Sequence, residues 1–215
     1  MNMKVIELFN SIDGEGKRAG MLATFIRLST CNLRCSYCDS AYAFDDKLAE
    51  EMSIQSIVEN CDKYDCPQIT LTGGEPLISR DVELLLSELD SHGYDVNVET
   101  NGSIDPSAYH KYKNVWFTID WKCPSSGMES KMNPKAFETL REQDVLKFVV
   151  GSNEDLQDAL HVIKKYNPKC SIYFSPVFGY DAKNIVEFMK DHKLNDCKVQ
   201  LQIHKYIYDP NARGV

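Results

Sequence analysis

The chain has 215 residues, of which 43% are hydrophobic and 26% are charged, as in an ordinary globular domain. Its net charge of −8 argues against non-specific nucleic-acid binding, which depends on lysine and arginine contacts to phosphate. No stretch has the length and apolarity of a membrane span, and residues 1–9 are too charged for a secretory signal. We therefore expect a cytoplasmic protein with a small-molecule ligand, in which the eight cysteines stay reduced.

Short apolar segments alternate with segments of helical periodicity along the chain. Strands are expected at residues 23–28, 68–72, 95–100, 115–120, 145–150, 171–175 and 198–203. Helices are expected after an N-cap at Ser53, over residues 81–91, after a cap at Asn153, and over residues 181–190. This alternation predicts one α/β domain over residues 1–215, with a mostly parallel sheet that curls into a barrel or part of one.

Several expected strands alternate polar and apolar residues. Asn97 and Glu99 alternate with valines, Thr118 and Asp120 share one side of the next strand with Lys122, and residues 198–204 alternate in the same way. Parallel strands that are buried on both faces read instead as continuous apolar runs. If the apolar sides meet the helices, the polar sides line a concave interior, which predicts a ligand site. A sheet with one solvated face is the alternative.

Three cysteines follow the first expected strand, with the spacing C-x3-C-x2-C at Cys31, Cys35 and Cys38. Three thiolates on one short loop can hold one metal cluster. Structural zinc sites and most cubane iron–sulfur clusters take four protein ligands, so this trio leaves one iron open to a ligand that is not protein. A zinc site that borrows Cys66 or a histidine is the alternative, and the other cysteines are expected to be buried thiols.

The strand at residues 68–72 runs directly into Gly73-Gly74-Glu75-Pro76. Two glycines permit unusual backbone angles and a close approach of a ligand to the chain. Exposed backbone groups and the Glu75 carboxylate suit a ligand ammonium group, although the run by itself also fits a tight turn. The run at residues 99–102 suits either a ligand contact or a simple turn at Asn101-Gly102.

The cysteine loop, with Tyr37 before its last cysteine, and the glycine run together resemble the radical S-adenosylmethionine (SAM) superfamily. The resemblance implies a [4Fe-4S] cluster on the three cysteines, with SAM chelating the open iron through its amino and carboxylate groups. It assigns the SAM amino group to Gly73, Gly74 and Glu75.

Further segments narrow the resemblance. Residues 9–16, 23–28, 39–40, 72–76 and 124–128 are together similar to the 7-carboxy-7-deazaguanine synthase family, over nearly the whole chain. This resemblance implies a lyase that converts 6-carboxy-5,6,7,8-tetrahydropterin to 7-carboxy-7-deazaguanine and ammonia, in queuosine and other 7-deazapurine biosynthesis. It also implies magnesium, a homodimer, a flavodoxin-like or ferredoxin-like electron donor, and a partial (β/α) barrel of the radical SAM type with reduced helices.

The resemblance gives roles to individual residues. Substrate contacts fall on Ile12, Asp13, Gly14, Glu15, Arg27, Thr72 and Val215. SAM contacts fall on Gly73, Gly74, Glu75, Asp120, Lys122, Ser175, Pro176, Val177 and Phe178, and magnesium falls on Ser40. A guanidinium fork suits the substrate carboxylate, and a hydroxyl oxygen suits Mg²⁺. The chain departs from many members of the family at Asp13, where glutamine is common, and at Asp120-Trp-Lys122, which replaces Ser-Pro-Lys.

Two other functions fit parts of the pattern. An activase of glycyl-radical enzymes shares the cysteine spacing, but it acts on a protein. Residues 12–16, Arg27 and Ser40 instead suit a small anionic substrate together with a metal. A non-catalytic metal-binding or redox-sensing module predicts no SAM binding and tolerance of substitutions at Gly73 and Gly74.

Overall fold

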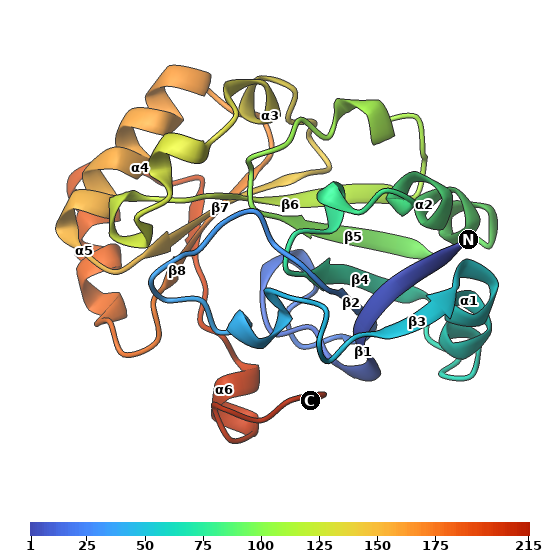
Figure 1. Ribbon diagram of the computed structural model, residues 1–215. Coiled ribbons are helices and arrows are strands. Elements are labelled where there is room, and N and C mark those ends of the chain that lie inside the picture. Colours follow the sequence, from blue (N-terminus) through green and yellow to red (C-terminus); the bar gives the residue numbers. More distant parts are fainter.

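The computed structural model describes residues 1–215, which form one nine-stranded sheet flanked by helices (Figure 1). The strand order is β3-β1-β2-β4-β5-β6-β7-β8-β9. The strands are β1 (Asn2–Ile12), β2 (Leu22–Leu28), β3 (Glu50–Ser53), β4 (Gln68–Gly73), β5 (Asp95–Thr100), β6 (Val115–Trp121), β7 (Val145–Val150), β8 (Ser171–Pro176) and β9 (Cys197–Val199). β1 is antiparallel to both of its neighbours, and every pair from β2 to β9 is parallel. Apart from β3, which lies outside β1, the strands follow one another in sequence order, and the sheet does not close, which confirms the expected partial barrel.

The helical layer is reduced, as expected. The helices are α1 (Ile54–Asp62), α2 (Val82–Ser91), α3 (Pro134–Glu138), α4 (Asn153–Tyr166), α5 (Ala182–Asp191) and α6 (His204–Ile207). α1 and α2 flank one end of the sheet, and α4 and α5 flank the other (Figure 1). β5 connects to β6 through only a short 3-10 turn at Ser107–Tyr109, and the next connection holds two 3-10 turns and the five-residue α3. None of the helices combines the length and apolarity that crossing a membrane requires.

The two faces of the sheet differ in chemistry. Side chains such as Leu71, Val98 and Phe148 are buried against the helices in one large hydrophobic core. The other face carries buried polar groups, among them Asn97 and Thr118, whose side chains are hydrogen-bonded at 3.0 Å. The polar positions therefore lie on the inner face of the sheet, away from the helices, as the alternation along the strands predicted.

Two strands and two boundaries differ from the sequence predictions. β1 and β3 were not predicted, because polar inner-face residues interrupt the apolar pattern of β1 and because β3 is short, with two glutamates among its four residues. The N-cap of α4 is Ser152 rather than Asn153, since the Ser152 hydroxyl accepts the amide of Asp155 in a capping box. The last strand ends at Val199 instead of continuing to residue 203. Beyond it, the amide of Ile203 donates to the Gly14 carbonyl at 3.2 Å and holds the chain outside the sheet.

The connection between β1 and β2 packs on the end of the sheet where the parallel strands begin. The contact is made by Arg18, which the sequence analysis missed. This side chain is buried, and its guanidinium donates to the carbonyls of Ile69 and Asp95 at 2.8 and 2.9 Å. It also donates to the Thr70 hydroxyl at 2.7 Å and forms an ion pair with Asp13 at 3.3 Å. One arginine thus joins this connection to the first residues of β4 and β5.

The variant Arg18→Met is expected to lower the free energy of unfolding by about 3–5 kcal/mol, because it leaves the buried Asp13 carboxylate without its cation. Urea denaturation measures the change. The control Lys190→Gln breaks the exposed pair with Glu187 and is expected to leave stability unchanged. An Arg18→Met protein as stable as the wild type would show that this contact set contributes little.

Candidate active site

The three cysteines lie on the loop that follows β2, beyond the carboxyl ends of the parallel strands. All three thiols are free and partly exposed. The loop is held in its middle by Ser36, whose amide and hydroxyl donate to the carbonyls of Ser126 and Ser125 at 3.1 and 2.7 Å. Its geometry therefore depends on the 3-10 turn Pro124–Ser126, which follows β6.

The donor set fits a cluster better than a single ion. No three His, Cys, Asp or Glu side chains converge closely enough to hold one metal ion. Cys66, proposed above as a fourth zinc ligand, precedes β4 at the opposite edge, with its sulfur 3.5 Å from the Leu22 carbonyl. Cys66 is therefore not placed to complete a zinc site with the three cysteines. The Cys31 sulfur accepts hydrogen bonds from the Leu33 amide at 3.4 Å and the Asn101 amide group at 3.8 Å, as cluster sulfurs do.

Burial affects the protonation of these thiols. Burial raises the pKa values of both Cys31 and Cys35 above the ordinary thiol value. The Lys122 ammonium opposes this effect at Cys35, because its positive charge favours the thiolate. Lys122 thus provides positive charge close to the cysteine loop.

The glycine run packs directly against the cysteine loop. The Gly73 φ angle is +144°, and a Cβ at this position would lie 2.2 Å from the Leu28 carbonyl oxygen. A Cβ on Gly74 would lie 1.9 Å from the Thr30 carbonyl oxygen. The Gly74 amide donates to Leu28 at 3.1 Å, and the next amide, of Glu75, donates to Thr30 at 2.8 Å. Both glycines are thus required by the approach of two backbone segments.

Glu75 is buried beneath this contact. Its carboxylate accepts hydrogen bonds from the amides of Leu77 and Asn101, at 3.0 and 2.7 Å, and from the Thr100 hydroxyl at 2.7 Å. Burial raises the pKa of Glu75 to about 7, and the three donors act in the opposite direction. These bonds tie the end of β5 to the cysteine loop through Asn101. The assignment of Glu75 to the SAM amino group stays a prediction.

Two of the expected substrate residues lie in a polar row on the inner face. The Arg27 Nε atom pairs with Glu7 at 2.8 Å, and the Tyr42 hydroxyl donates to the same carboxylate at 2.9 Å. Thr72, which is the register partner of Arg27, donates to Glu99 at 2.8 Å. Glu7 and Tyr42 were missed in the sequence analysis. Glu7 could have been found only from its antiparallel pairing with Arg27, and that pairing involves β1, a strand that was not predicted.

Glu15 reaches into the sheet and meets the expected SAM residues. Its carboxylate accepts the Ser175 hydroxyl at 2.7 Å and pairs with Lys147 at 3.2 Å. Lys147 also pairs with Asp120 at 3.2 Å, and Asp120 pairs with Lys122 at 2.7 Å. Burial opposes ionisation of Asp120, but the two lysines hold the pKa of this carboxyl below its usual range. The structure thus brings four predicted residues together around a lysine that the sequence analysis missed.

Other predicted residues lie around this centre. Ile12 ends β1, and Asp13 faces Arg18. Gly14 packs against the His204 ring, where a Cβ would lie 1.9 Å from Nδ1. The Ser40 hydroxyl lies 4.0 Å from the Cys38 sulfur and donates to Asp39 at 3.3 Å, so oxygen donors that suit Mg²⁺ adjoin the cysteine loop.

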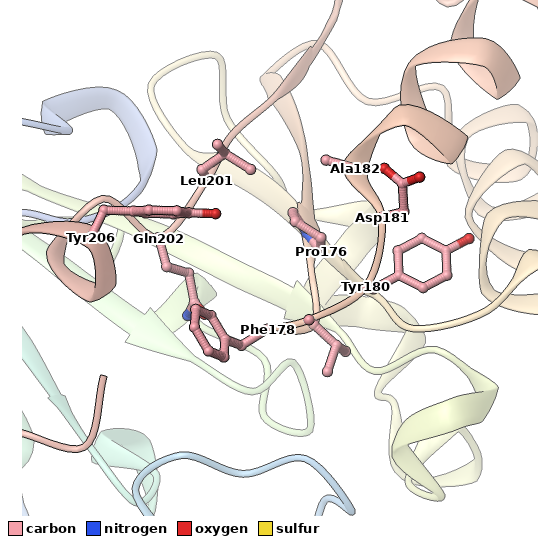
Figure 2. A pocket seen from close by; sticks show the side chains of 10 residues that line it. Pro176, Phe178, Tyr180, Asp181, Ala182, Leu201, Gln202 and Tyr206 are labelled. Carbon is pink, nitrogen blue, oxygen red and sulfur yellow. The ribbon is translucent and has the colours of Figure 1, made fainter. Parts of the chain in front are cut away.

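Pro176, Val177 and Phe178 line a pocket of about 310 Å³ between the β8–α5 connection and α6 (Figure 2). Its other walls include Leu201, Gln202 and Tyr206. α6 is held beside it by Lys205, which pairs with Asp39 at 3.3 Å and lies 5.3 Å from the centre of the Phe178 ring.

Val215 is partly buried at the end of the tail. Two residues earlier, the Arg213 guanidinium stacks 3.8 Å from the centre of the Tyr42 ring. The tail therefore lies next to Tyr42, which contacts the Glu7–Arg27 pair.

Comparison with known proteins defines the class. Residues 25–192 match the family model of the radical SAM superfamily, which covers most of the chain. The 7-carboxy-7-deazaguanine synthase of Clostridium acetobutylicum is 46% identical over the full length of both chains. That of Methanospirillum hungatei is 37% identical over 95% of this chain and 85% of its own. The chain is thus a radical SAM protein, and within that superfamily it belongs to the 7-carboxy-7-deazaguanine synthase family.

Solved structures share the fold. The crystal structure of QueE from Escherichia coli superimposes with a TM-score of 0.73 over 94% of each chain, at 21% identity. Streptococcus suis SuiB bound to S-adenosylmethionine gives a TM-score of 0.56 over 80% of this chain and 44% of that one, at 14% identity. At these identities the likeness supports the architecture of the sheet and nothing more specific.

Asp155 connects the cysteine loop to α4. Its buried carboxylate accepts the Ser125 amide and hydroxyl at 2.8 and 2.5 Å and the Gly151 amide at 2.7 Å, and Ser125 in turn accepts from Ser36. The variant Asp155→Ala is expected to lose about 2 kcal/mol of stability, because these buried donors lose their acceptor. It is also expected to release iron to a chelator faster than the wild type.

The matched control for Asp155→Ala is Ser53→Ala, which removes the N-cap of α1 at a cost of about 1 kcal/mol. It is expected to leave the rate of iron release unchanged, since α1 packs on α2, β1 and β3. Identical iron release from Asp155→Ala and wild-type protein would contradict a link between this carboxylate and the cysteine loop.

Proposed function

We propose that the chain is a radical SAM lyase that converts 6-carboxy-5,6,7,8-tetrahydropterin to 7-carboxy-7-deazaguanine with release of ammonia, in 7-deazapurine and queuosine biosynthesis. The proposal rests on one observation above all. The three-cysteine loop packs on the Gly73-Gly74 turn beside a polar inner face, in a chain 46% identical to a named synthase over its full length. Family membership favours this function over a glycyl-radical activase or a non-catalytic module.

The residues present suit the cofactors that this reaction needs. Cys31, Cys35 and Cys38 would hold a [4Fe-4S] cluster, and SAM would bind beside the glycine run, Asp120, Lys122 and the segment at residues 175–178. When bound, the cluster and SAM supply an electron and the radical that removes a hydrogen from the substrate. The protein supplies binding, orientation and exclusion of water. The Ser40 hydroxyl would provide an oxygen ligand to Mg²⁺.

The inner face suits the substrate. Arg27 uses only Nε for Glu7, so its terminal nitrogens are oriented by that pair to hold the substrate carboxylate. Thr72 and Glu15 present polar groups to the pterin edges, and residues 12–14 would contact it from the β1–β2 connection. The tail ending at Val215 would cover this side of the site. A reacting group held in this way reaches its partner without a search through orientations.

The proposal extends to partners and location. The single electron would come from a flavodoxin-like or ferredoxin-like donor, and the resemblance supports a homodimer. The whole of residues 1–215 would act as one catalytic domain. A cytoplasmic location would keep the three thiols reduced and able to bind a cluster.

An anaerobic assay of the reconstituted, reduced protein tests the proposed function. The mixture contains SAM, 6-carboxytetrahydropterin and Mg²⁺, with a parallel sample without Mg²⁺, and mass spectrometry follows the product. Formation of 7-carboxy-7-deazaguanine is the expected result. Release of 5′-deoxyadenosine with no such product would keep the radical SAM chemistry and reject the substrate.

A further inference from the structure

Lys147 is the buried cation of the inner face, and none of the roles above uses it. It lies in β7, and its side chain is only 8% exposed. Burial of an amine normally lowers its pKa, but the carboxylates of Asp120, Glu15 and Glu99 raise the pKa of Lys147 well above the ordinary lysine value. The geometry identifies Lys147 as a permanently charged centre among acidic groups.

The two carboxylates that pair with Lys147 come from different parts of the chain. Glu15, in the β1–β2 connection, lies 3.2 Å from the ammonium, and Asp120, near the end of β6, lies at the same distance. By the proposed function, the first belongs to the substrate side of the site and the second to the SAM side. Lys147 is thus the ionic bridge between the two sides, in addition to the hydrogen bond that the SAM-side Ser175 hydroxyl donates to Glu15.

Both carboxylates are also held at their second oxygen. Glu15 Oε1 accepts the Ser175 hydroxyl at 2.7 Å, while Oε2 faces Lys147. Asp120 Oδ2 faces Lys122 at 2.7 Å, while Oδ1 faces Lys147. A ligand that orders Asp120 and Lys122 therefore orders Lys147 as well, and through it Glu15.

Removing the Lys147 charge would leave Glu15 without a cation and Asp120 with Lys122 alone, although the two carboxylates are only 15% and 16% exposed. Such a carboxylate must move, take up water or bind a proton. Each of these changes separates the orientation of Glu15 from that of Asp120, without removing any group that is assigned to a ligand.

We propose, on the basis of the proposed function, that Lys147 is a positioning residue that couples the substrate side of the site to the SAM side. Binding of one ligand fixes the bridge, and the other ligand then meets a carboxylate that is already ordered. Such coupling is reciprocal, so the pterin tightens SAM binding by the same factor as SAM tightens pterin binding.

The test compares dissociation constants for SAM with and without saturating 6-carboxytetrahydropterin. Equilibrium dialysis of reconstituted, unreduced protein measures both without turnover. We expect the pterin to tighten SAM binding about tenfold in the wild type and in Lys147→Arg, which keeps the charge. In Lys147→Met the factor is expected to fall to about one, and under turnover conditions more 5′-deoxyadenosine should form per product.

Lys198→Met is the matched control, because Lys198 contacts the Tyr173 hydroxyl of the same sheet and pairs with no carboxylate. In this control the pterin is expected to tighten SAM binding by the same factor as in the wild type. If Lys147→Met fails to fold, Lys147→Gln, which removes the charge but keeps an amide donor between the two carboxylates, is expected to lose the effect of the pterin on SAM binding in the same way.

The outcomes separate this inference from the proposed function. A wild-type protein that makes no 7-carboxy-7-deazaguanine overturns the proposed function. A wild-type protein that makes it while the pterin leaves SAM affinity unchanged overturns the coupling. The coupling is also overturned if the pterin tightens SAM binding in Lys147→Met as much as in the wild type. It is supported if this effect is lost in Lys147→Met and kept in Lys147→Arg and Lys198→Met.

Discussion

Replacing Cys35 with alanine is expected to abolish both cluster assembly and product formation. The chain offers three thiols on one loop, and the loss of one leaves two thiolates for the cluster. A cluster held by two thiolates on a partly exposed loop loses iron to solvent and to chelators. Iron and sulfide content per chain, measured after anaerobic reconstitution, reports assembly, and the mass-spectrometric assay reports turnover.

The control for this variant is Cys197→Ala, which removes a partly buried thiol in β9, far along the chain from the cysteine loop. It is expected to keep the full iron content and wild-type turnover. A Cys35→Ala protein with normal iron content and normal product formation would show that the cluster assignment is wrong.

Gly74→Ala is expected to give a large loss of stability. The added Cβ would lie 1.9 Å from the Thr30 carbonyl oxygen and 2.4 Å from its carbon, so it meets backbone that cannot rotate away. Relief requires the cysteine loop to separate from the β4 turn, at a cost of about 3 kcal/mol or more. Because the cysteines lie on that loop, SAM binding to the reconstituted protein is expected to be lost as well.

Gly93→Ala is the matched control for Gly74→Ala. Gly93 has a φ angle of +79°, but a Cβ there would meet no atom within 4 Å. It is expected to cost about 1–2 kcal/mol through backbone strain alone and to leave SAM binding intact. Urea denaturation and SAM binding measure both variants. Equal losses in the two would mean that the contact between the glycine run and the cysteine loop contributes nothing.

Much of the fold was predictable because its signals are local. Helical periodicity and N-caps predicted α1, α2 and α5. The alternation of polar and apolar residues along β5 and β6 predicted the polar inner face of the sheet. The unpredicted elements have weak local signals. β1 mixes polar and apolar residues without a clear period, because its pairing with β2 and the inner face decides its pattern.

The sequence by itself determined the cysteine loop, the glycine run and the family, since each depends on spacing between near neighbours in the chain. Only the tertiary structure decided how those motifs are connected. The bond between Glu15 and Ser175 spans 160 residues, and Arg18 and Lys147 act on groups from several strands. In the sequence, a single lysine in an apolar strand gives no indication of a functional role. Burial among carboxylates that only folding assembles makes Lys147 the cation of the site, because charges interact through space and not along the chain.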